Sequence, residues 1–223
     1  KEIEDQHLRI LDKGPSKVSP FCVPRLMSNA ASGNIAINYG LRGPNFCVSS
    51  ACASGNHAIG EAFGNILAGR SDVMITGAAE AAVTPIGLAS FCAARSLSTR
   101  NDNPNAASRP FDKDRDGFVL AEGAGIIVLE EESHARKRGA KIYAELMGYA
   151  ATDDGYHITA PLPDGDGAAS WQAQCPSRPV RFPSRKATSS HRHLTPPADR
   201  GFHSVVAWLD GYTGRWSRGR PTE

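Results

Sequence analysis

The sequence has no long apolar run. Its mean hydropathy is −0.34, and no uninterrupted apolar stretch exceeds a handful of residues, which argues against a transmembrane helix. The first five residues, KEIED, contain no apolar segment of the kind that a secretory signal peptide needs. The first residue is also not methionine, which suggests that sequence upstream is missing. We therefore expect a cytoplasmic protein that does not enter a membrane.

The cysteines also lack a pairing pattern. The chain has five cysteines, an odd number, and no two of them form a CxxC pair. This count argues against both a disulfide framework and a zinc ribbon, so reduced thiols, no metal site and no cofactor are expected. The cysteines are Cys22, Cys47, Cys52, Cys92 and Cys175.

The charge of the chain is divided unevenly. With 223 residues, 40% hydrophobic and 22% charged, the chain can build one sizeable core or two small ones. Residues 1–172 carry 16 basic and 20 acidic side chains, whereas residues 173–223 carry 9 basic and 3 acidic ones and 6 of the 15 prolines. We place a boundary near Trp171, between a domain at 1–171 and a basic tail at 172–223. The tail is expected to be disordered or frame-shifted. Its charge would attract phosphate, but it lacks a nucleic-acid-binding motif, so no such partner is expected.

Residues 1–171 have the pattern of alternating strands and helices. Gly69 and Gly139 are placed to end the two helices, and the second helix has an i,i+4 pair between Glu132 and Arg136. Short links between these elements favour βαβ units and a sheet covered on its faces. Strands are predicted at 45–49, 72–77, 124–130 and 141–150, and helices at 58–67 and 131–138.

Cys52 is the candidate nucleophile. It lies between a predicted strand and the first turn of a long predicted helix, within the segment GPNFCVSSACASGNHAI. The unpaired amides and partial positive charge of a helix N-terminus favour thiolate over thiol and would bind a developing oxyanion. The small neighbours of Cys52 leave room for a bulky acyl substrate. Spacing alone is equally compatible with a buried structural cysteine.

One stretch resembles the opening of a calcium loop. The sequence of 112–117, DKDRDG, starts like an EF-hand, but its twelfth position is Gly123 instead of glutamate. Lys113 and Arg115 also lower the negative charge of the stretch. A loop tied by Asp/Arg pairs is therefore the better prediction.

The segment around Cys52 resembles the active-site signature of the β-ketoacyl-acyl carrier protein synthases, in their bacterial type II branch. The similarity runs from about residue 1 to about residue 171 and includes several further blocks in the same order. These blocks are SKVSPF (16–21), YGLRGP (39–44), ARSLSTRND (94–102), SRPFD (108–112) and KRGAKIY (137–143).

This resemblance implies an α/β chain, an incomplete thiolase-like layered αβαβα fold with a mixed sheet and a buried central helix. It also implies an acyltransferase of fatty acid biosynthesis, a 3-oxoacyl-[acyl-carrier-protein] synthase. Cys52 would take an acyl group from acyl carrier protein. Malonyl-carrier protein would then be decarboxylated, and its carbanion would attack the acyl-cysteine.

Three further residues acquire expected roles through the same resemblance. Phe91 would line the acyl pocket, and His157 would lie in a loop near the entrance. Arg95 would meet the acidic carrier protein. Each of them has a plainer reading, as a core aromatic, a loop residue and a solvated charge respectively. The complete family member is expected to be a homodimer.

The partners of the cysteine in this family are absent from the sequence. The 223 residues contain no His-Gly-Thr, no Gly-His and no Gly-Phe-Gly-Gly-Thr. His57 cannot replace them, because five positions along a helix rotate it by roughly 140° away from Cys52, so a packing role is expected. The chain alone is therefore expected to be inactive in condensation. The alternatives are a polyketide-type ketosynthase, or a non-catalytic fragment that only self-associates or binds carrier protein.

Overall fold

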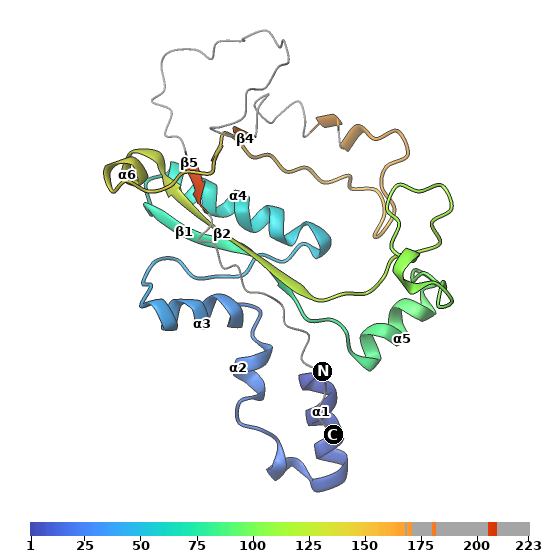
Figure 1. Ribbon diagram of the computed structural model, residues 1–223. Helices are drawn as coiled ribbons and strands as arrows, with labels where there is room; N and C mark the ends of the chain where they lie inside the picture. Colours follow the sequence, from blue (N-terminus) through green and yellow to red (C-terminus); the bar gives the residue numbers. More distant parts are fainter. Residues whose placement is uncertain (168, 171–179, 182–204, 209–223) are drawn as a thin grey trace. The chain divides into compact units, whose positions relative to one another are not determined.

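The computed structural model describes residues 1–167, 169–170, 180–181 and 205–208 (Figure 1). The chain divides into two compact units. The first unit comprises Lys1–Ser54 and Gly77–Gly125. The second unit comprises the described residues of Gly55–Thr76 and Ile126–Glu223. The chain passes between the units at the start of one helix and within two strands.

The second unit is built on a five-stranded sheet with the order β1-β2-β5-β3-β4. Strands β2 and β3 both run antiparallel to β5, so they are parallel to each other with β5 between them. A helix, α6, joins these two parallel strands, which is the strand-helix-strand connection expected from the sequence. The elements are α4 (Ser54–Leu67), β1 (Val73–Glu80), β2 (Gly123–Glu131), α6 (Glu132–Lys137), β3 (Ala144–Leu146), β4 (Val180–Arg181) and β5 (Val205–Trp208).

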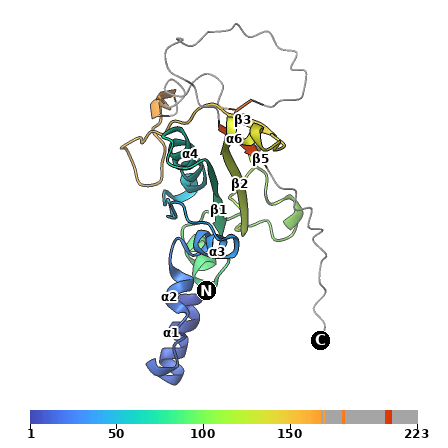
Figure 2. The ribbon, with the colours of Figure 1, turned by 90° about the vertical axis from the view of Figure 1, so that its left-hand side faces the viewer.

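The core of the second unit lies between α4 and the sheet, and Figure 2 shows α4 running alongside β1 and β2. Phe63 and Ile66 are three positions apart on α4 and therefore share one face of the helix. They pack with Leu129 of β2, which is fully buried, and with Met74 and Tyr149. The other face of α4 is exposed, so the helix is amphipathic.

Glycine ends both predicted helices of the second unit, as the sequence indicated. Gly69 has φ 67°, and the next amide, that of Arg70, donates to the carbonyl of Asn65 at 3.0 Å. Gly139 has φ 71°, and the amide of Ala140 donates to Ala135 at 2.9 Å. This 6→1 bond after a left-handed residue is the Schellman motif. The predictions for α4 and α6, including the Glu132–Arg136 pair, are confirmed.

The first unit is mainly helical. The first helix has three acidic residues in its first turn, which suits the positive end of the helix dipole. Its one buried residue, Gln6, accepts the amide of Ser19 at 2.8 Å and so ties the helix to the following turn. The helices are α1 (Glu2–Lys13), α2 (Cys22–Leu26), α3 (Ala30–Tyr39) and α5 (Pro85–Ala93), with single 3-10 turns η1 (Pro15–Lys17), η2 (Ala51–Ala53) and η3 (Pro104–Ala106).

Two strand predictions need correction. The expected strand at 45–49 is wrong, since these residues have no regular secondary structure and all but Val48 are exposed. A strand exists only where a neighbouring backbone completes its hydrogen bonds, which a local sequence pattern does not report. The expected strand at 141–150 shrinks to β3, the three residues that pair with β5 and β4.

The expected tail contributes to the sheet at two places. Val180–Arg181 and Val205–Trp208 form β4 and β5. The remaining residues of the tail lie outside the described ones, and the boundary near Trp171 stays a prediction. Within the part of the chain that the structure describes, every helix is too short or too polar to cross a membrane.

Candidate active site

Cys52 lies at the middle of η2, the single 3-10 turn that leads directly into α4. Its side chain is exposed and its thiol is free. The sequence placed it between a strand and the first turn of the long helix. The structure places it two residues before that helix begins, which still puts it at the helix N-terminus. The alternative of a buried structural cysteine is therefore not what the structure shows.

Ser54 holds the turn that carries Cys52. Its hydroxyl accepts the amide of Ser50 at 2.8 Å and donates to the carbonyl of Ala51 at 2.7 Å, so it bridges both ends of the turn. The amide of Ala53 closes the turn by donating to the carbonyl of Ser50 at 3.1 Å. The Ser54 hydroxyl therefore fixes the carbonyl group of Ala51, the residue directly before Cys52.

The same turn contains backbone strain. Ala51 has φ 50°, a left-handed conformation that costs a residue with a Cβ roughly 1–2 kcal/mol. Such strain persists only where the surrounding structure enforces it, and it clusters at functional sites. Here the Ser54 bridge enforces it next to the candidate nucleophile.

Phe91 lies on α5, near its C-terminal end, and remains 38% exposed. Its ring meets the ring of Phe118 edge-on, with centroids 5.1 Å apart and planes at 83°. This arrangement is the favoured geometry of an aromatic pair. Phe91 is therefore a partly exposed aromatic beside Phe118, and not a fully buried core residue.

Arg95 ends α5 in a left-handed conformation with φ 52°. Its amide donates to Cys92, and the amide of Ser96 donates to the carbonyl of Phe91 at 3.2 Å, which is again the Schellman pattern. Glycine is the usual residue at such a position, so arginine here carries a strain cost that the fold tolerates. The Arg95 side chain is exposed and accessible to a partner.

The two histidines of interest belong to the second unit. His157 is exposed, and its Nδ1 accepts the amides of Thr159 at 3.1 Å and Ala160 at 3.0 Å, which leaves Nε2 to carry the proton of the neutral ring. His57 is half-buried and meets the ring of Tyr149 at 6.3 Å in an edge-on arrangement. The packing role expected for His57 agrees with this contact.

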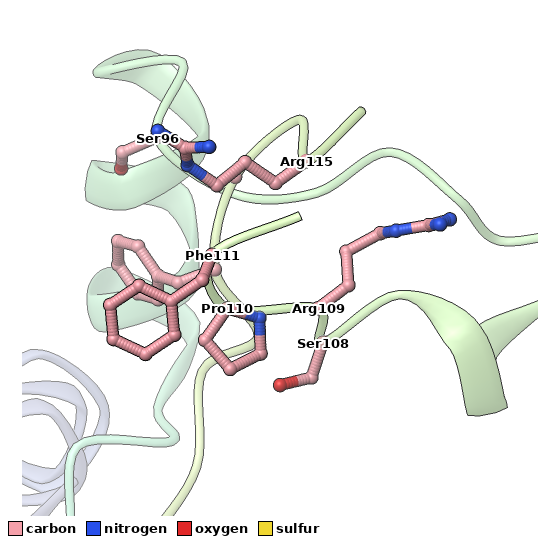
Figure 3. A pocket seen from close by; sticks show the side chains of 8 residues that line it. Ser96, Ser108, Arg109, Pro110, Phe111 and Arg115 are labelled. Atoms are coloured by element: carbon pink, nitrogen blue, oxygen red, sulfur yellow. The ribbon is translucent and has the colours of Figure 1, made fainter. Parts of the chain in front are cut away.

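A cavity of about 800 Å³ lies in the first unit beside Phe118 (Figure 3). In Figure 3 the side chains of Arg109 and Arg115 extend in different directions. Phe118 connects the cavity to Phe91. The cavity is lined by Ser96, Ser108, Arg109, Pro110, Phe111, Arg115, Gly117 and Phe118.

The loop around the cavity is tied by Asp/Arg pairs, as the sequence indicated. Arg109 donates to the carboxylate of Asp112 at 2.9 Å, and Arg100 lies 3.4 Å from that of Asp116. The Ser98 hydroxyl and the Thr99 amide also donate to Asp116 and lower its pKa to about 2. The amide of Asp114 and the Arg109 side chain likewise lower the pKa of Asp112.

No group of three or more His, Cys, Asp or Glu side chains that could hold a metal ion occurs among the described residues. The carboxylates of Asp112 and Asp116 are instead bound to arginine, serine and backbone amides.

The resemblance assigned roles to Cys52, Phe91, Arg95 and His157. The structure places the first three in the first unit and His157 in the second. Sequence reasoning missed the Ser54 bridge and the cavity. The block at 108–112 contributed to the resemblance and supplies four of the cavity residues. Its role in a cavity depends on the position of Phe118 beside Leu97, which no local pattern reveals.

The cysteine-bearing turn before a partly buried helix defines a thiol site in an α/β chain, and comparison with known proteins identifies its class. Residues 2–135 match the family model described as "Beta-ketoacyl synthase, N-terminal domain". The chain belongs to this family. The α/β class expected from the sequence is confirmed.

Two curated relatives within this family share one printed name. The chain is 58% identical over 168 residues to the 3-oxoacyl-[acyl-carrier-protein] synthase 2 of Synechocystis sp., and 56% identical over 167 residues to that of Vibrio cholerae. Each match covers 75% of this chain and 40% of the relative. The chain thus spans about 40% of the length of these curated relatives.

Solved ketosynthases share the fold. One is a ketosynthase bound to the hexaketide, in complex with its type II polyketide acyl-carrier protein. It has a TM-score of 0.74 and 38% identity, with 78% of this chain and 44% of that chain covered. A β-ketoacyl synthase from Burkholderia phymatum has a TM-score of 0.70 and 36% identity, with 78% and 43% covered.

Proposed function

We propose that this chain is the cysteine-bearing part of a 3-oxoacyl-[acyl-carrier-protein] synthase of fatty acid biosynthesis. The observation that carries the proposal is the exposed Cys52 thiol, held by Ser54 in a strained turn at the head of α4. The identity of 58% to a relative with this printed name supports it. A layered thiolase-like arrangement around α4 belongs to the same proposal.

The chemistry of loading follows from the turn. The Cys52 thiolate attacks the carbonyl carbon of an acyl thioester, and the carrier's thiolate leaves, which forms a new thioester on Cys52. Amide groups at the start of α4 stabilise the negative charge on the carbonyl oxygen during this step. Phe91 borders the acyl chain.

Condensation needs further groups. Decarboxylation of a malonyl thioester produces an enolate whose oxygen must be stabilised, and the resemblance assigns this task to two histidines. The His-Gly-Thr and Gly-His sequences that would supply them do not occur in the 223 residues. The proposal therefore assigns acyl loading to this chain and condensation to the complete family member.

The proposed partners are acyl- and malonyl-loaded acyl carrier protein and a second copy of the chain. Arg95 is exposed at the end of α5, where a basic side chain attracts an acidic carrier.

The exposed residues 45–49, which have strand-forming composition, would pair with those of a second copy to form a homodimer. His157 is proposed to contact substrate from its loop.

The polyketide alternative rests on the solved ketosynthase at 38% identity. The higher identity of 58% to the curated synthase favours the fatty acid branch. A fragment that only self-associates would bind carrier protein but would not accept its acyl group.

Acyl transfer from dodecanoyl-acyl carrier protein tests the proposal. After incubation, peptide mass spectrometry should locate the acyl group on Cys52, and Cys52→Ala should lower total adduct formation by at least about tenfold. Cys47→Ser is the matched control, because Cys47 is also exposed in the first unit, and it should behave like wild type. Malonyl-carrier protein should give no 3-oxoacyl product with this chain alone. Binding of carrier protein without any Cys52 adduct would contradict the proposal.

A further inference from the structure

Helix α5 carries Phe91, yet it is not held in place by burial. None of its residues, Pro85–Ala93, is buried. Helices in proteins are normally fixed by packing an apolar face, and α5 lacks that support among the described residues. The position of α5 must therefore be set where its two ends are attached.

The N-terminal end is attached by hydrogen bonds. Thr84 caps the helix, and its Oγ1 accepts the amide of Gly87 at 3.0 Å. Pro85 has no amide hydrogen, so the remaining donor of the first turn is the amide of Ile86. That amide donates to Glu4 Oε1 at 2.9 Å, across 82 positions of sequence. Figure 1 shows the start of α5 beside the first turn of α1.

Glu4 is well suited to this attachment. Its side chain is only 15% exposed, and its carboxylate accepts the Ile86 amide at the positive end of α5. The bond from the Ile86 amide is the main cause that lowers the pKa of Glu4. The helix that carries Glu4 is itself anchored, through Gln6 to Ser19 and through Glu2 to Arg25.

The C-terminal end is attached through Phe91 and the turn after it. The Phe91 ring contacts Phe118, while the amide of Phe118 donates to Ser96 at 3.0 Å and the amide of Ser98 donates to Phe118 at 2.9 Å. A rotation of α5 about its N-terminal attachment would therefore move Phe91 against Phe118.

We propose that Glu4 is a positioning residue that sets the orientation of α5, and through it the place of Phe91 beside the acyl chain. This inference rests on the proposed function for the acyl pocket, and it names a residue that selects chain length without touching the substrate. Loss of the Glu4 bond leaves this end of α5 with the Thr84 cap and with the amide of Val83, which donates to Glu122 Oε1 at 3.0 Å one residue before the cap. The helix can then turn about this single point, so the Phe91 ring no longer has a single position.

The test measures acylation of Cys52 by hexanoyl and dodecanoyl thioesters of N-acetylcysteamine, as the ratio of the two rates. Glu4→Ala should change this ratio by at least about threefold, because small displacements of positioning groups alter rates strongly. Glu4→Gln keeps an oxygen that accepts the Ile86 amide and should stay close to wild type. Asp5→Asn, which removes an exposed carboxylate from the same helix turn, is the matched control and should leave the ratio unchanged.

A second measurement reads the ring position without any reaction. In protein labelled with 4-fluorophenylalanine, the fluorine resonance of Phe91, assigned with Phe91→Leu, should shift or broaden in Glu4→Ala but not in Glu4→Gln or Asp5→Asn. If wild type accepts no acyl group at all, the proposed function fails, while this resonance still decides the positioning role. An unmoved resonance overturns the inference. A proportional fall of both rates with an unchanged ratio overturns it as well.

Discussion

The two units of the chain are stabilised in different ways. In the second unit, α4 and the sheet enclose apolar side chains such as Phe63, Ile66 and Leu129. In the first unit, the described residues with comparable burial are only Gln6 and Ala107, and many large apolar side chains are exposed. The first unit depends instead on single hydrogen bonds, such as those of Ser54 and Glu4.

This contrast suggests a division of labour. Apolar burial supplies most of the free energy of folding but fixes individual groups only loosely, whereas a hydrogen bond adds little free energy and strongly restricts geometry. Cys52, Phe91 and Arg95, to which the proposed function assigns roles, lie in the first unit, whereas His157 lies in the second. Substitutions in the core of the second unit should therefore change stability, and substitutions in the first unit should change reactivity.

The largest effect is expected in the core of the second unit. Leu129→Ala removes a fully buried side chain and should lower the free energy of unfolding by about 2–5 kcal/mol, measured by urea denaturation. Ile126→Ala on the same strand is the control, since Ile126 is 42% exposed, and it should cost about 1 kcal/mol or less. Equal costs for the two variants would contradict the assignment of the core.

The next largest changes in unfolding free energy are expected at two glycines on α4. A Cβ at Gly60 would lie 2.2 Å from the Tyr149 ring, so Gly60→Ala should cost about 1–3 kcal/mol in unfolding free energy. A Cβ at Gly64 meets nothing within 4 Å, so Gly64→Ala should stabilise the helix by about 0.5–1 kcal/mol. Thermal unfolding of both variants measures this difference in sign, and the same sign for both would count against the packing of Tyr149 on α4.

The Ser54 bridge tests whether single hydrogen bonds in the first unit control the reactivity of Cys52. Ser54→Ala removes the bonds to Ser50 and Ala51 and should slow acylation of Cys52 by about tenfold, because the turn loses its fixed geometry. The accompanying loss of stability should be about 1 kcal/mol. Ser49→Ala, an exposed neighbour, serves as the control and should change neither quantity. A stability loss without a rate loss would show that the bridge does not serve the site.

The smallest effect concerns pH. The pKa of Asp116 is lowered to about 2 from its ordinary value of 3.8, first by the Ser98 hydroxyl and then by the Thr99 amide. Its ionised form therefore stabilises the fold above about pH 4, and this contribution is lost as the pH falls toward about 2. Asp116→Asn should flatten the acid limb of a stability profile. Identical profiles for wild type and Asp116→Asn would contradict the role of this carboxylate.

Much of the second unit could be predicted from sequence because its signals are local. Gly69 ends α4 and Gly139 follows α6, and the apolar residues of β1 and of β2 are consecutive in the sequence. The strand expected at 45–49 failed because its existence depends on a partner strand. The Glu4–Ile86 bond joins residues 82 positions apart, and neither residue is unusual in its own neighbourhood.

Cys52 is proposed to be the acyl acceptor because of its place in the fold. The ratio of acyl groups on Cys52 and Cys47, two exposed thiols of the same unit, after brief exposure to a dodecanoyl thioester checks this proposal. The folded chain should favour Cys52 by at least about tenfold, and the preference should vanish in a denaturing concentration of urea. Equal acylation of the two cysteines in the folded chain would contradict the account.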